Sequence, residues 1–196
     1  AEELLYLLGI LLHPDNSEVP FPVILTGPQS AAPYLQQLHE FVGATLGSSA
    51  QRLYQIIIDD PEQVAMQMAR GLETVRQFRH ARNDAYHFNW LLKIDEGFQR
   101  PFDPTHINMA NLSLSRELPP HELAANLRRA FSGIVAGNVK DKSIRLIEQL
   151  GSYEIQGEVA VMQPLDSLLQ AFVAQHRMKL PGGAAYVPCY RVVSCA

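Results

Sequence analysis

The chain has 196 residues, of which 47% are hydrophobic and 18% charged, and its formal net charge at pH 7 is −4. This composition excludes a disordered chain, and the length allows one good core or two small ones. The negative charge and the lack of Lys/Arg-rich runs argue against a nucleic-acid polymer as partner. No apolar run approaches the length of a membrane span, and the only cysteines are Cys189 and Cys195. We therefore expect a cytoplasmic protein with no membrane segment.

The first predicted elements are a helix and a strand. Residues 2–13 carry leucines at helical spacing, and the helix should end at Pro14. The run FPVILTG (21–27) is apolar and closed by a glycine, which is typical of a buried parallel strand. Thr26 and Gly27 then stand at the carboxyl end of that strand, where open α/β sheets bind ligands. A glycine required only for the turn is the simpler interpretation of this position.

A second helix and strand should follow. Ser30 is the predicted N-cap of the helix, and Gly47 its left-handed stop. The run LYQIIIDD (53–60) predicts another buried strand. Asp60, followed by a proline and a glutamate, is a strong start signal for a third helix. Asp60 therefore has a capping role that requires no chemistry.

This order of elements predicts the C-terminal part of a doubly wound, parallel, Rossmann-like α/β sheet over residues 1–80. Two strands cannot complete such a sheet, so we expect further strands from a preceding segment or from another chain. A polar, arginine-rich stretch near residues 79–84 predicts a domain junction. Residues 81–196 should form a smaller α+β domain. Its expected elements are strands at 86–94 and 109–115, helices at 120–136 (stopped by Gly137 and Asn138), 141–150 and 161–178, and a closing strand at 185–193.

The chain resembles a known family in several runs. The Lonely Guy phosphoribohydrolases carry a Pro-Gly-Gly-x-Gly-Thr-x-x-Glu motif, and Ala1-Glu2 fit its variable positions with Glu3 as the motif glutamate. The runs EELLYLLGILLHP, VILTGP, IIIDD, AYHFNW, RRAFSGIVAGNVKDKSIR, LLQAFVAQHRMKLPG and YVPCY closely resemble the bacterial nucleotide 5′-monophosphate nucleosidases. These enzymes join a Lonely Guy core to a C-terminal domain of their own, and the resemblance covers essentially the whole chain.

The resemblance implies hydrolysis of the N-glycosidic bond of purine and pyrimidine nucleoside 5′-monophosphates. The products would be the free base and ribose 5-phosphate. In that reaction positive charge develops on the ribose ring, and a carboxylate beside the anomeric carbon stabilises it. Glu3, one turn into a helix that follows a phosphate-binding glycine loop, is the candidate for that carboxylate. Glu2 is expected to be an ordinary acid of a helix N-terminus.

On this interpretation the chain is the C-terminal part of the enzyme and depends on the missing N-terminal part, which carries the phosphate loop. We expect the chain alone to be inactive. The resemblance also implies a homotetramer and no cofactor. Helices 120–136 and 161–178 show more apolar surface than one small sheet can cover, so we expect them at subunit contacts. The seven histidines and two cysteines lack metal-ligand spacing along the chain, so no metal site is predicted.

Two alternatives to the enzyme remain open at this point. The chain could be a non-catalytic module for ligand sensing or oligomerisation. It could also be a cytokinin-type phosphoribohydrolase, although those enzymes resemble the core alone and lack a long C-terminal domain.

A regulatory site is also predicted. The resemblance implies a response to guanosine tetra- and pentaphosphate. Cationic and aromatic side chains that suit such an effector are Arg79, Arg82 and Tyr86 at the junction, with Asn138 and Lys140 after the long helix. An ordinary solvated surface is the alternative interpretation of these residues.

Overall fold

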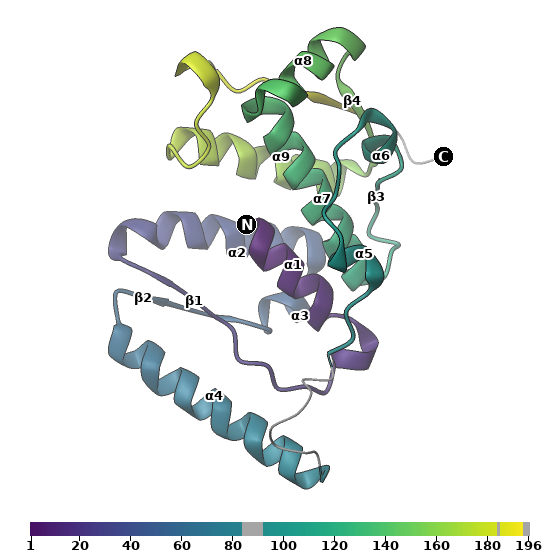
Figure 1. Cartoon of the computed structure of the whole chain (residues 1–196). Helices are drawn as coiled ribbons and strands as arrows, with labels where there is room; N and C mark the ends of the chain where they lie inside the picture. The colour runs from purple at the N-terminus through teal and green to yellow at the C-terminus, as the bar shows by residue number, and fades with distance from the viewer. Residues whose placement is uncertain (84–91, 184, 194–196) are drawn as a thin grey trace.

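Two small parallel sheets organise the chain (Figure 1). The structure is a computed structural model that describes residues 1–83, 92–183 and 185–193. One sheet pairs β1 (Ile24–Gly27) with β2 (Gln55–Ile58), and the other has the order β3-β4-β5, from β3 (Ser113–Leu114), β4 (Tyr153–Gly157) and β5 (Tyr190–Val193). All described strand pairs are parallel, which confirms the predicted α/β class.

Helices make up most of the described chain. They are α1 (Glu2–Leu11), α2 (Ala32–Leu46), α3 (Ser48–Gln51), α4 (Pro61–Ala81), α5 (Glu96–Gln99), α6 (His106–Ala110), α7 (Pro120–Val139), α8 (Asp141–Leu150) and α9 (Val159–Ala174), with short 3-10 turns η1 (Pro14–Asn16), η2 (Gln29–Ala31) and η3 (Pro181–Gly183). No helix within the described ranges combines the length and the apolar character needed to cross a membrane.

The first half folds largely as its signals predict. The β1–β2 sheet has α2 on one face and α4 on the other (Figure 1). Asp60 caps α4, since its Oδ1 accepts a hydrogen bond of 2.8 Å from the backbone N–H of Gln63. Gly47 ends α2 with a φ of 83°, in the left-handed region that glycine tolerates. The predicted cap at Ser30 is wrong, because this residue lies inside η2 and α2 begins after Ala31 without a side-chain cap.

The second half departs further from the sequence-based expectations. The strand expected at 109–115 is reduced to β3, because the residues before it form α6. Gly137 and Asn138 do not stop α7, which continues to Val139. A Cβ on Gly137 would lie 2.7 Å from the Sγ atom of Cys189, so this glycine serves close packing inside the helix. The strand expected at 86–94 falls mostly on 84–91, outside the described residues.

One hydrophobic core runs through both halves of the chain. Helix α1 packs antiparallel to α7. Glu2, at the start of α1, pairs with Arg128 of α7, and the ring of His13, just after the end of α1, contacts the ring of His121 at the start of α7. Helix α2 packs against α9. This contact, like that of α1 with α7, crosses the predicted domain junction. The side chains at the centre are fully or nearly fully buried: Leu5, Leu8, Leu38, Val42, Leu127, Ile134, Leu165 and Leu169. The domain division at residue 80 stays a prediction.

The apolar faces of the two long C-terminal helices are covered within the chain. Leu127 and Ile134 of α7 and Leu165 and Leu169 of α9 have no exposed surface. Helices α1 and α2 cover these side chains, while Val139 of α7 and Val159 of α9 stay exposed. A homo-oligomer with these helices at its subunit contacts stays a prediction.

Candidate active site at the carboxyl edge of the first sheet

The carboxyl ends of β1 and β2 form one edge of the first sheet, because the two strands are parallel and in register from Ile24↔Gln55 to Gly27↔Ile58. The chain leaves this edge into η2 and α2 after β1 and into α4 after β2. The C-terminal end of α1 leads through η1 to the start of β1. The first turn of α1 therefore points toward the carboxyl edge of the sheet (Figure 1). Ligands of parallel α/β sheets bind at this kind of edge.

The two glutamates in the first turn of α1 differ in their surroundings. Glu2 is partly buried, and its Oε1 lies 3.7 Å from Nη2 of Arg128. Arg128 also stacks on the ring of Tyr6, with its Cζ 5.0 Å from the ring centroid. Glu3 is exposed, and no group in the described part of the chain forms a hydrogen bond or ion pair with it. Glu2 is thus held by the packing of α1 on α7, whereas the carboxylate of Glu3 is available to a ligand.

An aromatic ring and a guanidinium group border the start of α1. The Tyr34 hydroxyl lies 3.1 Å from the backbone nitrogen of Ala1. The Cζ atom of Arg177 lies 3.9 Å from the centroid of the Tyr34 ring, within the range of a cation–π contact. Burial raises the pKa of Tyr34, and the nearby Arg177 partly opposes this shift. The phenol therefore stays protonated at neutral pH and can donate a hydrogen bond.

The loop that carries Arg177 is anchored to the end of α9. The backbone N–H groups of Arg177 and Met178 both donate to the carbonyl of Phe172, at 2.8 and 3.1 Å, and the Met178 side chain is buried. His176 turns the chain with a φ of 55°. Sequence reasoning did not select Tyr34 or Arg177. The run QHRMKLP, polar directly after an apolar helix, was the available signal for Arg177.

The predicted substrate-binding residues lie at the end of β1. Thr26 is exposed. A Cβ on Gly27 would lie 2.9 Å from the Cβ of Ala31, and the carbonyl of Gly27 accepts a 2.9 Å hydrogen bond from Asp59. Packing therefore accounts for the glycine. Asp59 is exposed at the end of β2 with a φ of 54°, and such strained residues cluster at ligand sites, although aspartate tolerates this region.

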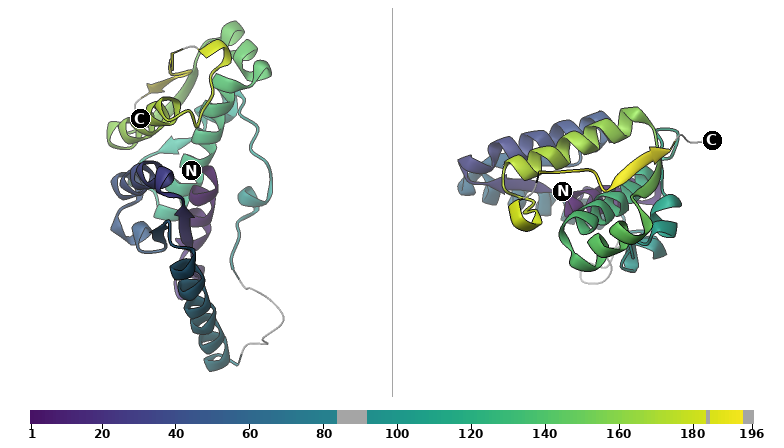
Figure 2. Two further views of the ribbon diagram at one scale, coloured as in Figure 1. Left: turned by 90° about the vertical axis from the view of Figure 1, so that its left-hand side faces the viewer. Right: turned by 90° about the horizontal axis from the view of Figure 1, so that it is seen from above.

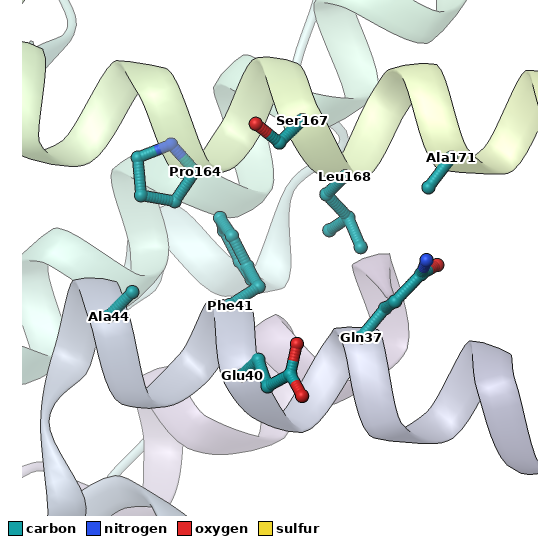
Figure 3. Close-up of a pocket in the computed structure, with 8 residues that line it drawn as sticks. All are labelled: Gln37, Glu40, Phe41, Ala44, Pro164, Ser167, Leu168 and Ala171. Atoms are coloured by element: carbon teal, nitrogen blue, oxygen red, sulfur yellow. The ribbon is translucent and has the colours of Figure 1, made fainter.

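A groove lies between α2 and α9 (Figure 3). It has a volume of about 280 Å³ and is lined by Gln37, Glu40, Phe41, Ala44, Pro164, Ser167, Leu168 and Ala171. Gln175 donates a 2.7 Å hydrogen bond to Gln37 at one end of the groove, one turn along α2 from Tyr34. None of the groove residues comes from α1, so we keep the groove separate from the candidate active site.

The predicted effector residues fall in two separate places. Arg79 and Arg82 lie at the end of α4, where Arg82 pairs with Glu18. Asn138 and Lys140 lie at the end of α7, where the Asn138 amide donates to Ile134 O and to the Sγ atom of Cys189. The ends of α4 and α7 are at opposite ends of the molecule (Figures 1 and 2). One chain therefore does not bring the two groups together, and Tyr86 lies outside the described residues.

Cys189 is buried, and this raises the pKa of its thiol to about 11. The thiol is protonated at neutral pH and is therefore a poor nucleophile. Groups that can ligate a metal do meet at the other end of α1, where the fold brings together His13, Asp95 and His121.

The fold and this edge define an α/β protein with a candidate site, where an exposed carboxylate, an aromatic ring and a guanidinium group lie near the start of α1. Comparison with known proteins makes this class specific. Residues 72–193 match the family model described as pyrimidine/purine nucleotide monophosphate nucleosidase, C-terminal. The chain is also 56% identical over 192 residues to the pyrimidine/purine nucleotide 5′-monophosphate nucleosidases of Escherichia coli strains K12 and O157:H7. The chain belongs to this nucleosidase family. The matched region is 98% of the chain but 42% of the length of these relatives.

Proposed function

We propose that this chain forms the C-terminal part of a nucleotide 5′-monophosphate nucleosidase. The enzyme hydrolyses the N-glycosidic bond of purine and pyrimidine nucleoside 5′-monophosphates to free base and ribose 5-phosphate. The observation that carries this proposal is the 56% identity, over 98% of the chain, to E. coli enzymes of that name. The carboxylate of Glu3, which is exposed and has no hydrogen-bond or ion-pair partner among the described residues, supports it from the geometry.

Glu3 acts on the sugar in this proposal. Breaking the N-glycosidic bond leaves positive charge on the ribose ring, and an anionic carboxylate beside the anomeric carbon lowers the energy of that state. The same carboxylate orients the attacking water and accepts its proton. A free carboxylate suits these roles, because an ion pair such as that of Glu2 with Arg128 would neutralise the charge that the reaction needs.

Arg177 and Tyr34 hold the substrate in this proposal. A guanidinium group forms charge-assisted, often bidentate, hydrogen bonds to phosphate oxygens. The Tyr34 ring holds the guanidinium in place from one side, and the protonated phenol supplies a further donor. Thr26 and Asp59 line the same edge and are proposed to contact the ribose hydroxyls. The N–H groups of the first turn of α1 complete the phosphate site together with the glycine loop that the family motif places before that helix.

The alternatives are less well supported. A cytokinin-type phosphoribohydrolase consists of the core alone, whereas the family model for the C-terminal nucleosidase part matches residues 72–193. A non-catalytic sensing or oligomerisation module requires no free acid at the carboxyl edge, where Glu3 is exposed.

Regulation and assembly follow the family resemblance. We propose a cytoplasmic homotetramer whose activity responds to a guanosine tetra- or pentaphosphate. Arg79, Arg82 and Tyr86 remain the proposed effector residues on one side, and Asn138 and Lys140 on the other. Because α4 and α7 end far apart, a single effector site that uses both groups has to lie between two subunits.

Substitution of the two glutamates tests the catalytic assignment. In the natural full-length polypeptide, Glu3→Gln should lower the rate of base release from GMP or AMP by about two orders of magnitude or more, with nucleotide binding retained. Glu2→Gln is the matched control and should keep near-normal turnover, with a small loss of stability from its ion pair with Arg128. Near-normal turnover in Glu3→Gln would remove this residue from the mechanism.

Substitution of Arg177 tests the phosphate site separately. Arg177→Ala should raise the KM for nucleotides about tenfold or more, and Arg177→Lys should restore part of the affinity because the charge remains without the planar fork. Arg145→Ala, an exposed arginine of α8, is the control and should leave KM unchanged. An unchanged KM in Arg177→Ala would exclude Arg177 from the phosphate site without affecting the assignment of Glu3.

A further inference from the structure

Three groups that can ligate a metal meet at the end of α1 remote from Glu3. His13 follows α1, Asp95 precedes α5, and His121 lies in the first turn of α7. One ligand atom from each lies within 4.8 Å of the other two. The two imidazole rings contact each other edge to face, with centroids 4.8 Å apart, and His13 Nε2 lies 3.9 Å from Asp95 Oδ1. The three residues are distant in sequence, so spacing along the chain could not reveal them.

A buried asparagine positions the acidic member of this cluster. Asn16 is 1% exposed, and its amide nitrogen donates to the carbonyls of Ile10, at 2.7 Å, and of Lys93, at 2.9 Å. Its carbonyl oxygen accepts a 2.7 Å hydrogen bond from the backbone N–H of Lys93. These bonds tie the segment before α5 to the end of α1. Asp95, two residues after Lys93, is thereby held beside His13.

The ligand set suits a transition metal. Two imidazoles and one carboxylate are the three-ligand set of many zinc sites, and imidazole also suits nickel, cobalt and copper. The histidine side chains are only 16% and 12% exposed, so their positions are restricted, while Asp95 is 45% exposed and can adjust. Tetrahedral zinc with bonds of about 2.1 Å places its ligands about 3.4 Å apart. Side-chain rotations that shorten the separations of these atoms, now up to 4.8 Å, by up to about 1.4 Å reach this geometry.

Two further carboxylates surround the cluster. Asp15 Oδ2 lies 4.0 Å from His13 Nδ1, and Glu122 Oε1 lies 3.9 Å from His121 Nε2. The partial negative charge at the C-terminal end of α1 adds to the negative potential of these carboxylates. The partial positive charge at the N-terminal end of α7 opposes it. The carboxylates of Asp15, Asp95 and Glu122 together favour a divalent cation.

The tautomer of His13 has to change when a metal binds. In the structure, the backbone N–H of Asp15 donates to His13 Nδ1 at 3.1 Å, so the proton of the neutral ring is on Nε2, facing Asp95. For Nε2 to bind a metal, that proton moves to Nδ1 and the hydrogen bond from the Asp15 backbone N–H breaks. The Asp15 carboxylate, 4.0 Å from Nδ1, then moves closer and accepts a hydrogen bond from the new N–H. A carboxylate that orients a metal-bound imidazole in this way is a common feature of such sites.

We propose that His13, Asp95 and His121 bind one divalent transition-metal ion of the zinc type, with water in the remaining position. Helix α1 has ten residues, so about 15 Å separates this cluster from the first turn that carries Glu3. The bound ion therefore takes no part in the reaction. It joins the end of α1, the segment before α5 and the start of α7, and fixes the helix from which Glu3 projects.

Titration of the metal-free full chain with zinc alone tests this site. Calorimetry should show one ion bound per chain, and Co²⁺ should give the intense visible absorption of a four-coordinate site. His121→Ala and Asp95→Asn should each weaken the affinity tenfold or more, and Asp15→Asn by about tenfold. His80→Ala is the control, since His80 is an exposed histidine at the end of α4 and should leave binding unchanged.

The variants distinguish a loss of metal binding from a loss of folding. Circular dichroism of each variant without metal establishes that it folds, and Asp95→Asn keeps the size of the side chain if His121→Ala does not fold. Zinc should also raise the Tm of the native chain and of His80→Ala, but not of the two ligand variants. Absence of saturable binding to the native chain would overturn the proposal. Retained affinity in either His121→Ala or Asp95→Asn would overturn the three-ligand site.

Discussion

Neighbouring residues in the first turn of α1 have different surroundings, and contacts rather than residue type separate them. Glu2 pairs with Arg128 of α7, whereas Glu3 is exposed. The sequence predicted this division only through the family motif, because both positions satisfy the same helix-start preference. Tyr34 and Arg177 were not predicted, since each is an ordinary residue until the fold places it beside the start of α1.

Because of Cys189, the unfolding free energy of the chain should fall as the pH rises in the alkaline range. Burial raises the pKa of its thiol from 9.0 to about 11, so the folded state keeps a proton that the unfolded state loses. Its contribution is complete below pH 9 and is lost as the pH rises through 11, by roughly 2–3 kcal/mol in total. Urea denaturation of the native chain and of Cys189→Ala should give unfolding free energies whose difference changes over this range. Parallel pH profiles of the two proteins would contradict the prediction.

At the scale of elements, the strongest local signals predicted the structure best. Asp60 followed by proline started α4, and Gly47 and Gly151 ended α2 and α8 with positive φ, because caps and turns depend on backbone chemistry within a few residues. Gly137 failed as a stop signal. Its role depends on Cys189, which lies 52 residues away, directly before β5, and no local pattern contains this residue.

The packing of α1 on α5 leads to an element-scale prediction. A Cβ on Gly9 would lie 2.4 Å from the ring of Phe98, which is packed and only 8% exposed. Gly9→Ala should therefore lower the unfolding free energy by about 1–3 kcal/mol, although alanine favours helices by about 1 kcal/mol over glycine. Chemical denaturation measures the change, and Phe98→Leu in the same chain should relieve part of it.

Gly43 of α2 provides the matched control. The atoms that a Cβ would meet there belong to the end of the Gln51 side chain, which can move aside if its 2.9 Å hydrogen bond to the His39 carbonyl breaks. Gly43→Ala should therefore lower the unfolding free energy less than Gly9→Ala does. A similar loss of stability at both glycines would show that the Phe98 ring is not the cause.

At the scale of the whole molecule, the core joins segments that the sequence predicted as two domains. Leu5 of α1 and Leu169 of α9 have no exposed surface and belong to the same hydrophobic cluster. Periodicity identified these buried faces correctly. It could not show that α1 would pack on α7 and α2 on α9, because the pairing of helices is decided by contacts between distant parts of the chain.

A shared core predicts a single unfolding transition. Leu5→Ala and Leu169→Ala should each lower the unfolding free energy by about 2–5 kcal/mol. Each variant should unfold in one transition, shifted to a lower denaturant concentration. The midpoint should be the same by circular dichroism and by tyrosine fluorescence. In hydrogen exchange, Leu169→Ala should reduce the protection of α2 amides although the substitution lies in α9. Two separate transitions, with α2 unaffected by Leu169→Ala, would favour independently folding halves.

The antiparallel packing of α1 on α7 also limits how such a protein can be altered by recombination. The helix that carries Glu3 is attached at both ends to the later half, through Arg128 near its start and His121 near its end. A shortened gene that lacked α7 and α9 would expose Leu4, Leu5 and Leu8 to water. The later half therefore cannot be inherited, exchanged or deleted as an independent module, and substitutions on the facing sides of α1 and α7 should accumulate in pairs.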